Sequence, residues 1–251
     1  MLRKYATELV GMSPDVLITE GTAAFAAVKS ETKSIPTIFV NVSDPVEQGF
    51  VTSLARPGGN ATGFTLFEFT TATKWVEILR ELSPTAKHIG FLFNPVGYPY
   101  EDLFFQAVRA AAEGVKIEVT AMPVEKDAEI ERSLAALAQQ LDSGLIALHD
   151  PFIIKRRNLV IAEAARHRLP AVYTLRTFAV SGGLISYGVD LADQWRQAAT
   201  YVDRMLRGAN PGELPVQQPT KFELVINLRT AKALNLTMPQ ALLVAADEVI
   251  E

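Results

Sequence analysis

Apolar and polar positions follow two rhythms along this chain. Short apolar runs such as Pro36–Asn41 (PTIFVN) and Gly144–Asp150 (GLIALHD) have the length of buried strands. Between such runs, apolar residues recur every three or four positions, as in Thr71–Leu82, where Trp75 and Ile78 lie on one helical face. Strand-like and helical segments alternate almost without interruption, which predicts βαβ units and parallel sheets.

The expected elements form two successive α/β series. The expected strands are Asp15–Thr19, Pro36–Asn41, Ala61–Thr65, His88–Asn94, Lys116–Pro123, Gly144–Asp150, Ala171–Thr174, Leu184–Gly188 and Phe222–Asn227. The expected helices are Met1–Met12, Thr22–Ser30, Pro45–Leu54, Thr71–Leu82, Tyr100–Glu113, Glu129–Leu141, Ile153–His167, Leu191–Arg207 and Arg229–Leu234. Two series of similar kind suggest two lobes.

The segment Asn41–Thr65 (NVSDPVEQGFVTSLARPGGNATGFT) is the most informative one. Ser43-Asp44-Pro45 has the order that starts a helix, because an oxygen-bearing cap precedes a proline near the first helical position. Arg56–Asn60 (RPGGN) predicts a tight turn. Polar groups at the carboxyl end of a parallel strand are placed where open α/β sheets bind ligands.

That segment carries a resemblance, together with GTAA at Gly21–Ala24, the run Ser181–Gly208 and the closing run Thr220–Glu251. The chain resembles the bacterial ABC-transporter substrate-binding protein family over nearly its whole length. The resemblance implies an α/β fold of the type I periplasmic-binding-protein kind, with two Rossmann-like lobes and a ligand cleft between them. Residues 1–65 and 189–219 would form the first lobe and 66–188 the second, while the lobe that takes 220–251 stays open.

In such a fold, strand ends from both lobes face the cleft, and this rule selects the candidate ligand-binding residues. Thr22 and Ser43 suit a ligand carboxylate, because helix N-termini attract anions. Asp44 and Asp150 suit a ligand ammonium or hydroxyl. The alternative for these residues is a role as helix caps. The full set of candidates is Thr22, Ser43, Asp44, Asn94, Asp150, Tyr187 and Phe178, with Phe67 and Tyr98 as weaker aromatic wall residues.

Composition narrows the chemistry. The net charge of −4 with mixed signs argues against a nucleic-acid partner. The absence of cysteine and the presence of three isolated histidines, His149 among them, disfavour a metal site. No nucleophile elbow, zinc-protease or phosphate-loop motif occurs, so we expect neither catalysis nor a cofactor. His149 is interpreted as a structural or rim residue.

The N-terminal sequence departs from the family pattern. Met1–Met12 (MLRKYATELVGM) predicts an amphipathic helix and lacks a secretory leader pattern, whereas a member should begin with an export signal, a strand and a helix. We therefore expect an N-terminally shortened chain with an unpaired strand edge that favours self-association. The resemblance implies a periplasmic or lipid-anchored extracytoplasmic location for the full-length form.

The sequence leaves several functions open. The first is a solute-binding component of an ABC importer, which takes a small polar ligand, an amino acid among the candidates, and delivers it to a membrane permease. The second is a cytoplasmic effector-sensing domain of a regulator, against which the lack of a helix-turn-helix segment counts. The third, an α/β enzyme, is least favoured because no catalytic constellation is visible.

Overall fold

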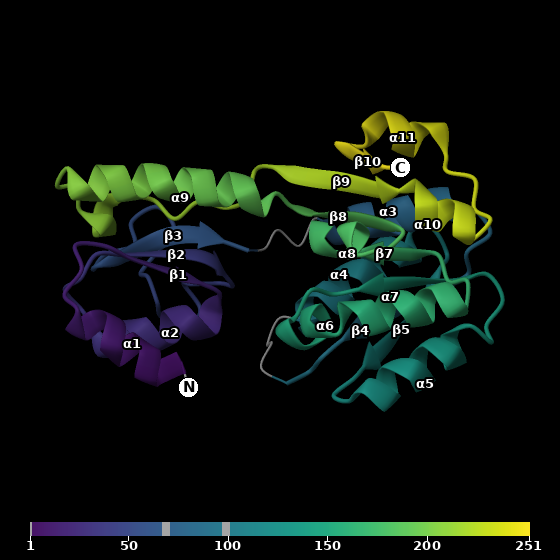
Figure 1. Cartoon of the computed structure of the whole chain (residues 1–251), viewed down its shortest axis with the longest axis horizontal. Helices are drawn as coiled ribbons and strands as arrows, with labels where there is room; N and C mark the ends of the chain where they lie inside the picture. Colours follow the sequence, from purple (N-terminus) through teal and green to yellow (C-terminus); the bar gives the residue numbers. More distant parts are fainter. Residues whose placement is uncertain (1, 67–70, 97–100) are drawn as a thin grey trace. The chain divides into compact units, whose positions relative to one another are not determined.

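The computed structural model describes residues 2–66, 71–96 and 101–251, and the chain divides into two compact units. Unit 1 comprises residues 1–68 and 189–221, and unit 2 comprises residues 69–188 and 222–251 (Figure 1). The chain thus passes between the units after residues 68, 188 and 221. Most of the closing segment, from residue 222 onward, lies in unit 2.

Unit 1 is built on a parallel sheet with the strand order β1-β2-β3. Its elements are α1 (Leu2–Gly11), β1 (Leu17–Glu20), α2 (Thr22–Glu31), β2 (Thr37–Val42), β3 (Ala61–Thr65), α9 (Leu191–Leu206) and the 3₁₀ turn η1 (Pro211–Glu213). Figure 1 shows α1 and α2 on one side of this sheet and α9 on the other. The sheet is therefore the middle layer of unit 1.

The alternation of side chains along β2 explains the two apolar layers of unit 1. Phe39 points toward α2 and packs on Phe25, with ring centroids 4.8 Å apart. Ile38 and Val40 point the other way and form a cluster with Tyr201 of α9. All of these side chains are buried, so β2 is covered on both faces.

Unit 2 contains a larger sheet with the strand order β10-β9-β8-β7-β6-β4-β5. Its strands are β4 (His88–Phe93), β5 (Glu118–Pro123), β6 (Ser143–Ala147), β7 (Ala171–Tyr173), β8 (Ile185–Val189), β9 (Phe222–Asn227) and β10 (Glu248–Ile250). Its helices are α3 (Thr71–Leu82), α4 (Glu101–Glu113), α5 (Asp127–Leu137), α6 (Pro151–Lys155), α7 (Arg157–Arg166), α8 (Arg176–Val180), α10 (Leu228–Ala233) and α11 (Gln240–Ala245). The expected α/β class with parallel sheets is confirmed.

The predicted helix over Pro45–Leu54 is wrong. The segment forms turns, in which the carbonyl of Pro45 accepts hydrogen bonds from the N–H groups of Phe50 and Val51. Asp44 and Gly49 both adopt positive φ, at 32° and 65°, and such left-handed residues interrupt a right-handed helix. The capping pattern was present in the sequence, but the helix that it should start is absent from this described segment.

Other differences concern short elements. The helix expected over Ile153–His167 begins earlier, at Pro151, and breaks at Arg156 into α6 and α7. The turn η1 was not among the expected elements. The expected elements also did not include α8, α11 and β10, which are between three and six residues long. Segments of that length are too short to show a periodic pattern.

Candidate ligand-binding site

In unit 1 the structure brings Thr22, Ser43 and Asp44 together at the carboxyl edge of the sheet. The Thr22 hydroxyl oxygen accepts a hydrogen bond from the N–H of Ser43 at 3.0 Å, which ties the start of α2 to the end of β2. Asp44 Oδ1 accepts from the N–H of Glu47 at 3.1 Å. No side chain caps the first turn of α2, which follows Gly21 at φ 81°. That turn presents backbone N–H groups suited to an anion.

A further polar residue at this edge, Asn41, was not among the predicted site residues. It is buried, lies at a register shift of the β2–β3 pair, and adopts a φ of 58°. Its amide Nδ2 donates to the carboxylate of Glu20 at 3.2 Å. Asparagine tolerates the left-handed conformation better than most residues. An asparagine at the end of a predicted strand was the sequence signal that could have added Asn41 to the candidates.

In unit 2 Asp150 and Asn94 form one hydrogen-bonded cluster. Asp150 Oδ1 accepts from the N–H of Ile153 and Oδ2 from the N–H of Asn94, both at 2.8 Å. Asn94 in turn donates to the carbonyl of Val124 at 2.6 Å and accepts from the N–H of Val96 at 3.1 Å. Asp150 is 1% exposed and caps α6. Its carboxylate therefore joins the end of β4 to the start of α6.

Burial sets the protonation of this cluster. Loss of solvent raises the pKa of Asp150 to about 6, although hydrogen bonds from the N–H groups of Ile153 and Asn94 act in the opposite direction. Burial lowers the pKa of the neighbouring His149 to about 4, so its imidazole is neutral at pH 7. His149 Nδ1 lies 2.7 Å from the hydroxyl oxygen of Thr174. The hydroxyl oxygen of Thr174 also lies 3.2 Å from the carbonyl oxygen of Ala147.

The predicted aromatic residues Tyr187 and Phe178 stack on other aromatic rings of unit 2. Tyr187 on β8 is partly exposed and stacks on Phe222, with ring centroids 5.9 Å apart. Phe178 on α8 is fully buried and stacks on Tyr173 at 5.0 Å. Phe178 thus supports the core of unit 2 in this structure. The weaker candidates Phe67 and Tyr98 lie outside the described residues.

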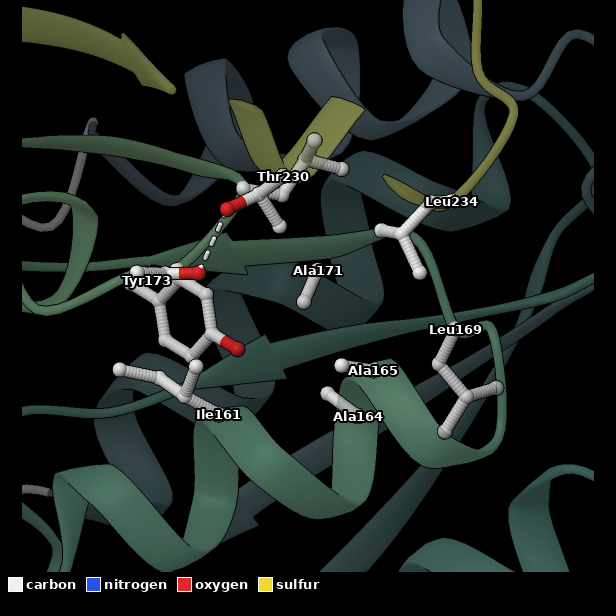
Figure 2. A pocket seen from close by; sticks show the side chains of 11 residues that line it. Ile161, Ala164, Ala165, Leu169, Ala171, Tyr173, Thr230 and Leu234 are labelled. Carbon is white, nitrogen blue, oxygen red and sulfur yellow. Dashed lines mark hydrogen bonds between the residues drawn. The ribbon is translucent and has the colours of Figure 1, made fainter. Parts of the chain in front are cut away.

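Figure 2 shows an apolar cavity inside unit 2 between α7, β7 and α10. The hydroxyl of Thr230 donates to the carbonyl of Gly182 at its edge, at 2.8 Å. The volume of the cavity is about 10 Å³, which is at most the space for one water molecule. The cavity is therefore a small packing gap and too small for an amino acid.

The described part of the chain offers no cluster of three or more histidine, aspartate or glutamate side chains that could hold a metal ion. None of the described helices is both long enough and apolar enough to cross a membrane. The polar groups at the strand ends are hydrogen-bond donors and acceptors that bond to the protein's own backbone in this structure.

Solved structures define the class to which this fold belongs. A conserved domain protein of Vibrio cholerae superposes with a TM-score of 0.87 at 30% sequence identity, over 99% of this chain and 82% of that one. The ABC domain from Streptococcus pneumonia in complex with L-Trp superposes with a TM-score of 0.85 at 25% identity, over 99% of this chain and 85% of that one. The fold is of the periplasmic-binding-protein type I-like class.

The family follows from the sequence. The model of the ABC transporter substrate binding protein family matches residues 1–250, and the chain belongs to this family. The Tyrosine-binding protein of Clostridioides difficile is 27% identical over 231 residues. That match covers 92% of this chain and 66% of the relative, so the chain spans just under two thirds of the relative's length.

Proposed function

We propose that this chain is the solute-binding component of an ABC importer and that its ligand is an amino acid. The family match over residues 1–250 carries the proposal. Two similar proteins are described with an amino acid, tyrosine in one and L-Trp in the other. In this proposal the chain works outside the cytoplasm, hands its ligand to a membrane permease and catalyses no reaction.

The polar clusters support an amino acid as the ligand. The uncapped first turn of α2 beside Ser43 suits the α-carboxylate, because backbone N–H groups and the helix dipole both favour an anion there. In unit 2, the side-chain oxygens of Asp150 and Asn94 already accept backbone N–H groups, so the proposed contact with the ligand rests on the carboxylate site in unit 1. Tyr187 offers a partly exposed ring for an apolar side chain.

A calorimetric screen tests the proposal. Titration of the protein with the standard amino acids, tyrosine and tryptophan included, should give saturable binding for at least one of them. Sugars and dicarboxylates of similar size serve as comparison ligands. Saturable binding of a sugar with no binding of any amino acid would contradict the ligand class, and failure of all solutes would contradict the proposed function.

Ala23→Glu tests the carboxylate contact at α2. Ala23 is exposed in the first turn, where a negative charge stabilises the helix but repels a bound carboxylate. We expect affinity for the best amino acid to fall at least about tenfold while the melting temperature stays equal or rises. Ser30→Glu, at the exposed other end of α2, is the matched control and should bind as the parent does. Unchanged affinity of Ala23→Glu would show that the carboxylate binds elsewhere.

A further inference from the structure

Helices α3 and α4 of unit 2 leave a recess between them, which we call the α3–α4 hollow. Its volume is about 410 Å³, within the roughly 300–1,000 Å³ of small-molecule sites. The cavity of Figure 2, by contrast, has a volume of about 10 Å³. The α3–α4 hollow is lined mainly by Val76, Glu77, Arg80 and Glu81 of α3, by Ala111 of α4 and by Val115, which follows α4. All of these residues belong to unit 2.

A step from large to small side chains opens the α3–α4 hollow. Trp75 of α3 and Phe104 of α4 pack against each other between the helices, with ring centroids 5.4 Å apart. Ala111 follows Phe104 by seven residues, so it lies on nearly the same side of α4, but its side chain is a single methyl group. The two helices therefore pack closely around the rings and leave space beside Ala111.

The lining of the α3–α4 hollow combines buried apolar side chains with charged ones at the edge. Val76 is buried, and Ala111 and Val115 are half-buried. Glu77 and Arg80 are exposed. A ligand that matches this lining has an apolar part for the three small side chains and a charged part for the edge.

Glu81 is the lining residue whose charge lacks compensation. The carboxylate of Glu77 is paired with Lys74, with 3.2 Å between Oε2 and Nζ. Glu81 Oε2 is shielded from solvent and accepts no hydrogen bond from the described residues. The last torsion of a glutamate is broad and two-fold, so either oxygen can turn to a donor in the hollow. Such a carboxylate favours a cation that can donate N–H groups.

We propose that the α3–α4 hollow binds a small primary amine that carries one positive charge. The ammonium donates to the carboxylate of Glu81, and a short alkyl chain lies on Val76, Ala111 and Val115. Arg80 at the edge disfavours a second positive charge, so the site selects against diamines. This site is independent of the carboxylate contact proposed at α2 of unit 1.

Titration with n-butylammonium, followed by amide NMR of the protein, tests the ligand chemistry. We expect saturable shifts centred on residues 76–81 and 111–115. Butyltrimethylammonium has the same charge and chain but no N–H group, and 1,4-diaminobutane adds a second charge. Both should bind at least about tenfold more weakly. Equal affinity of either compound, or no saturable shifts with n-butylammonium, would overturn the proposal.

A lysine side chain of a partner protein carries the same chemical group, and Nα-acetyl-lysine amide distinguishes the two sources. We expect it to bind more weakly than n-butylammonium, because its amide groups add polar atoms for which the apolar lining offers no partner. Tighter binding of Nα-acetyl-lysine amide would overturn the assignment to a free amine.

Two pairs of variants locate the binding. Glu81→Gln removes the charge and Ala111→Leu fills the hollow, so each should weaken n-butylammonium binding at least about tenfold. Glu131→Gln removes an exposed carboxylate of α5, and Ala110→Leu adds the same side chain at the exposed neighbouring position of α4. Both controls should bind as the parent does, and amide spectra outside the hollow verify that each variant is folded. Binding that survives both Glu81→Gln and Ala111→Leu would place the amine elsewhere and overturn the proposal.

Discussion

At the scale of single residues, Asp150 shows how one carboxylate serves two neighbours. The sequence predicted it at a strand-to-helix junction and left open whether it binds a ligand or caps a helix. The structure shows the cap, with one oxygen on the N–H of Ile153 and the other on the N–H of Asn94. The second contact comes from a residue 56 positions away, so no local pattern could have predicted it.

The pKa of Asp150 predicts a pH dependence of stability. The value is about 6 in the folded protein, against an ordinary 3.8, so between these values the folded state binds a proton that the unfolded state has released. Folding stability from this group therefore increases as the pH falls through 6 and is lost as the pH rises through it. From pH 7 to pH 5 the free energy of unfolding should rise by about 1 kcal/mol relative to Asp150→Asn. Urea denaturation of both proteins at the two pH values measures this difference. An equal change in the free energy of unfolding of the parent and of Asp150→Asn between pH 7 and pH 5 would contradict the prediction.

At the scale of elements, the longer periodic segments were predictable and the loops were not. Thr71–Leu82 was predicted with its observed bounds, because its apolar positions repeat over twelve residues. The Pro45–Leu54 segment carried the signals of a helix start, yet its path depends on Gly49 and on packing of Val51 in the core of unit 1. The candidate site residues Thr22, Ser43 and Asp150 were selected by strand-end position alone, and their hydrogen-bond partners required the three-dimensional structure.

Substitution of Gly63 tests how closely β2 and β3 approach each other. An added Cβ at Gly63 would lie 1.9 Å from the carbonyl oxygen of its strand partner Phe39. Gly63→Ala should therefore lower the free energy of unfolding by about 3 kcal/mol, the upper part of the range for overpacking. Gly11→Ala is the matched control, because nothing lies within 4 Å of its added Cβ. Equal stability of the two variants in thermal unfolding would show that the strands separate to admit the methyl group.

At the scale of the whole molecule, edge strands and central strands of the two sheets differ in how well they are enclosed. Among the described residues, β1 pairs only with β2 and carries the exposed Ile18, whereas β6 of unit 2 lies between β4 and β7 and is buried along its whole length. Because β6 contacts a strand on each side, local unfolding that exposes its amides has to disrupt more of the unit.

Hydrogen exchange should reveal this difference. Amides of β1 should exchange fastest, those of the edge strand β5 at an intermediate rate, and those of β6 slowest. β5 is the matched control, because it is also an edge strand but belongs to the larger sheet. Equal protection of β1 and β6 in mass spectrometry would show that the two units open together.

The discontinuity of both units has a consequence for how the protein is made. The sheet of unit 1 is covered by α9, and the hydroxyl of Thr62 donates at 2.6 Å to the carbonyl of Leu214, which leaves the ribosome 152 residues later. The sheet of unit 2 likewise lacks β9 and β10 until residues 222–251 have been made. Unit 1 cannot finish folding until residues 189–221 have been made, and unit 2 cannot finish until residues 222–251 have been made, unlike domains that complete in order from the N-terminus. During that interval the apolar surface around Ile38, Val40 and Phe64 lacks the cover that α9 and Leu214 give it in the finished protein.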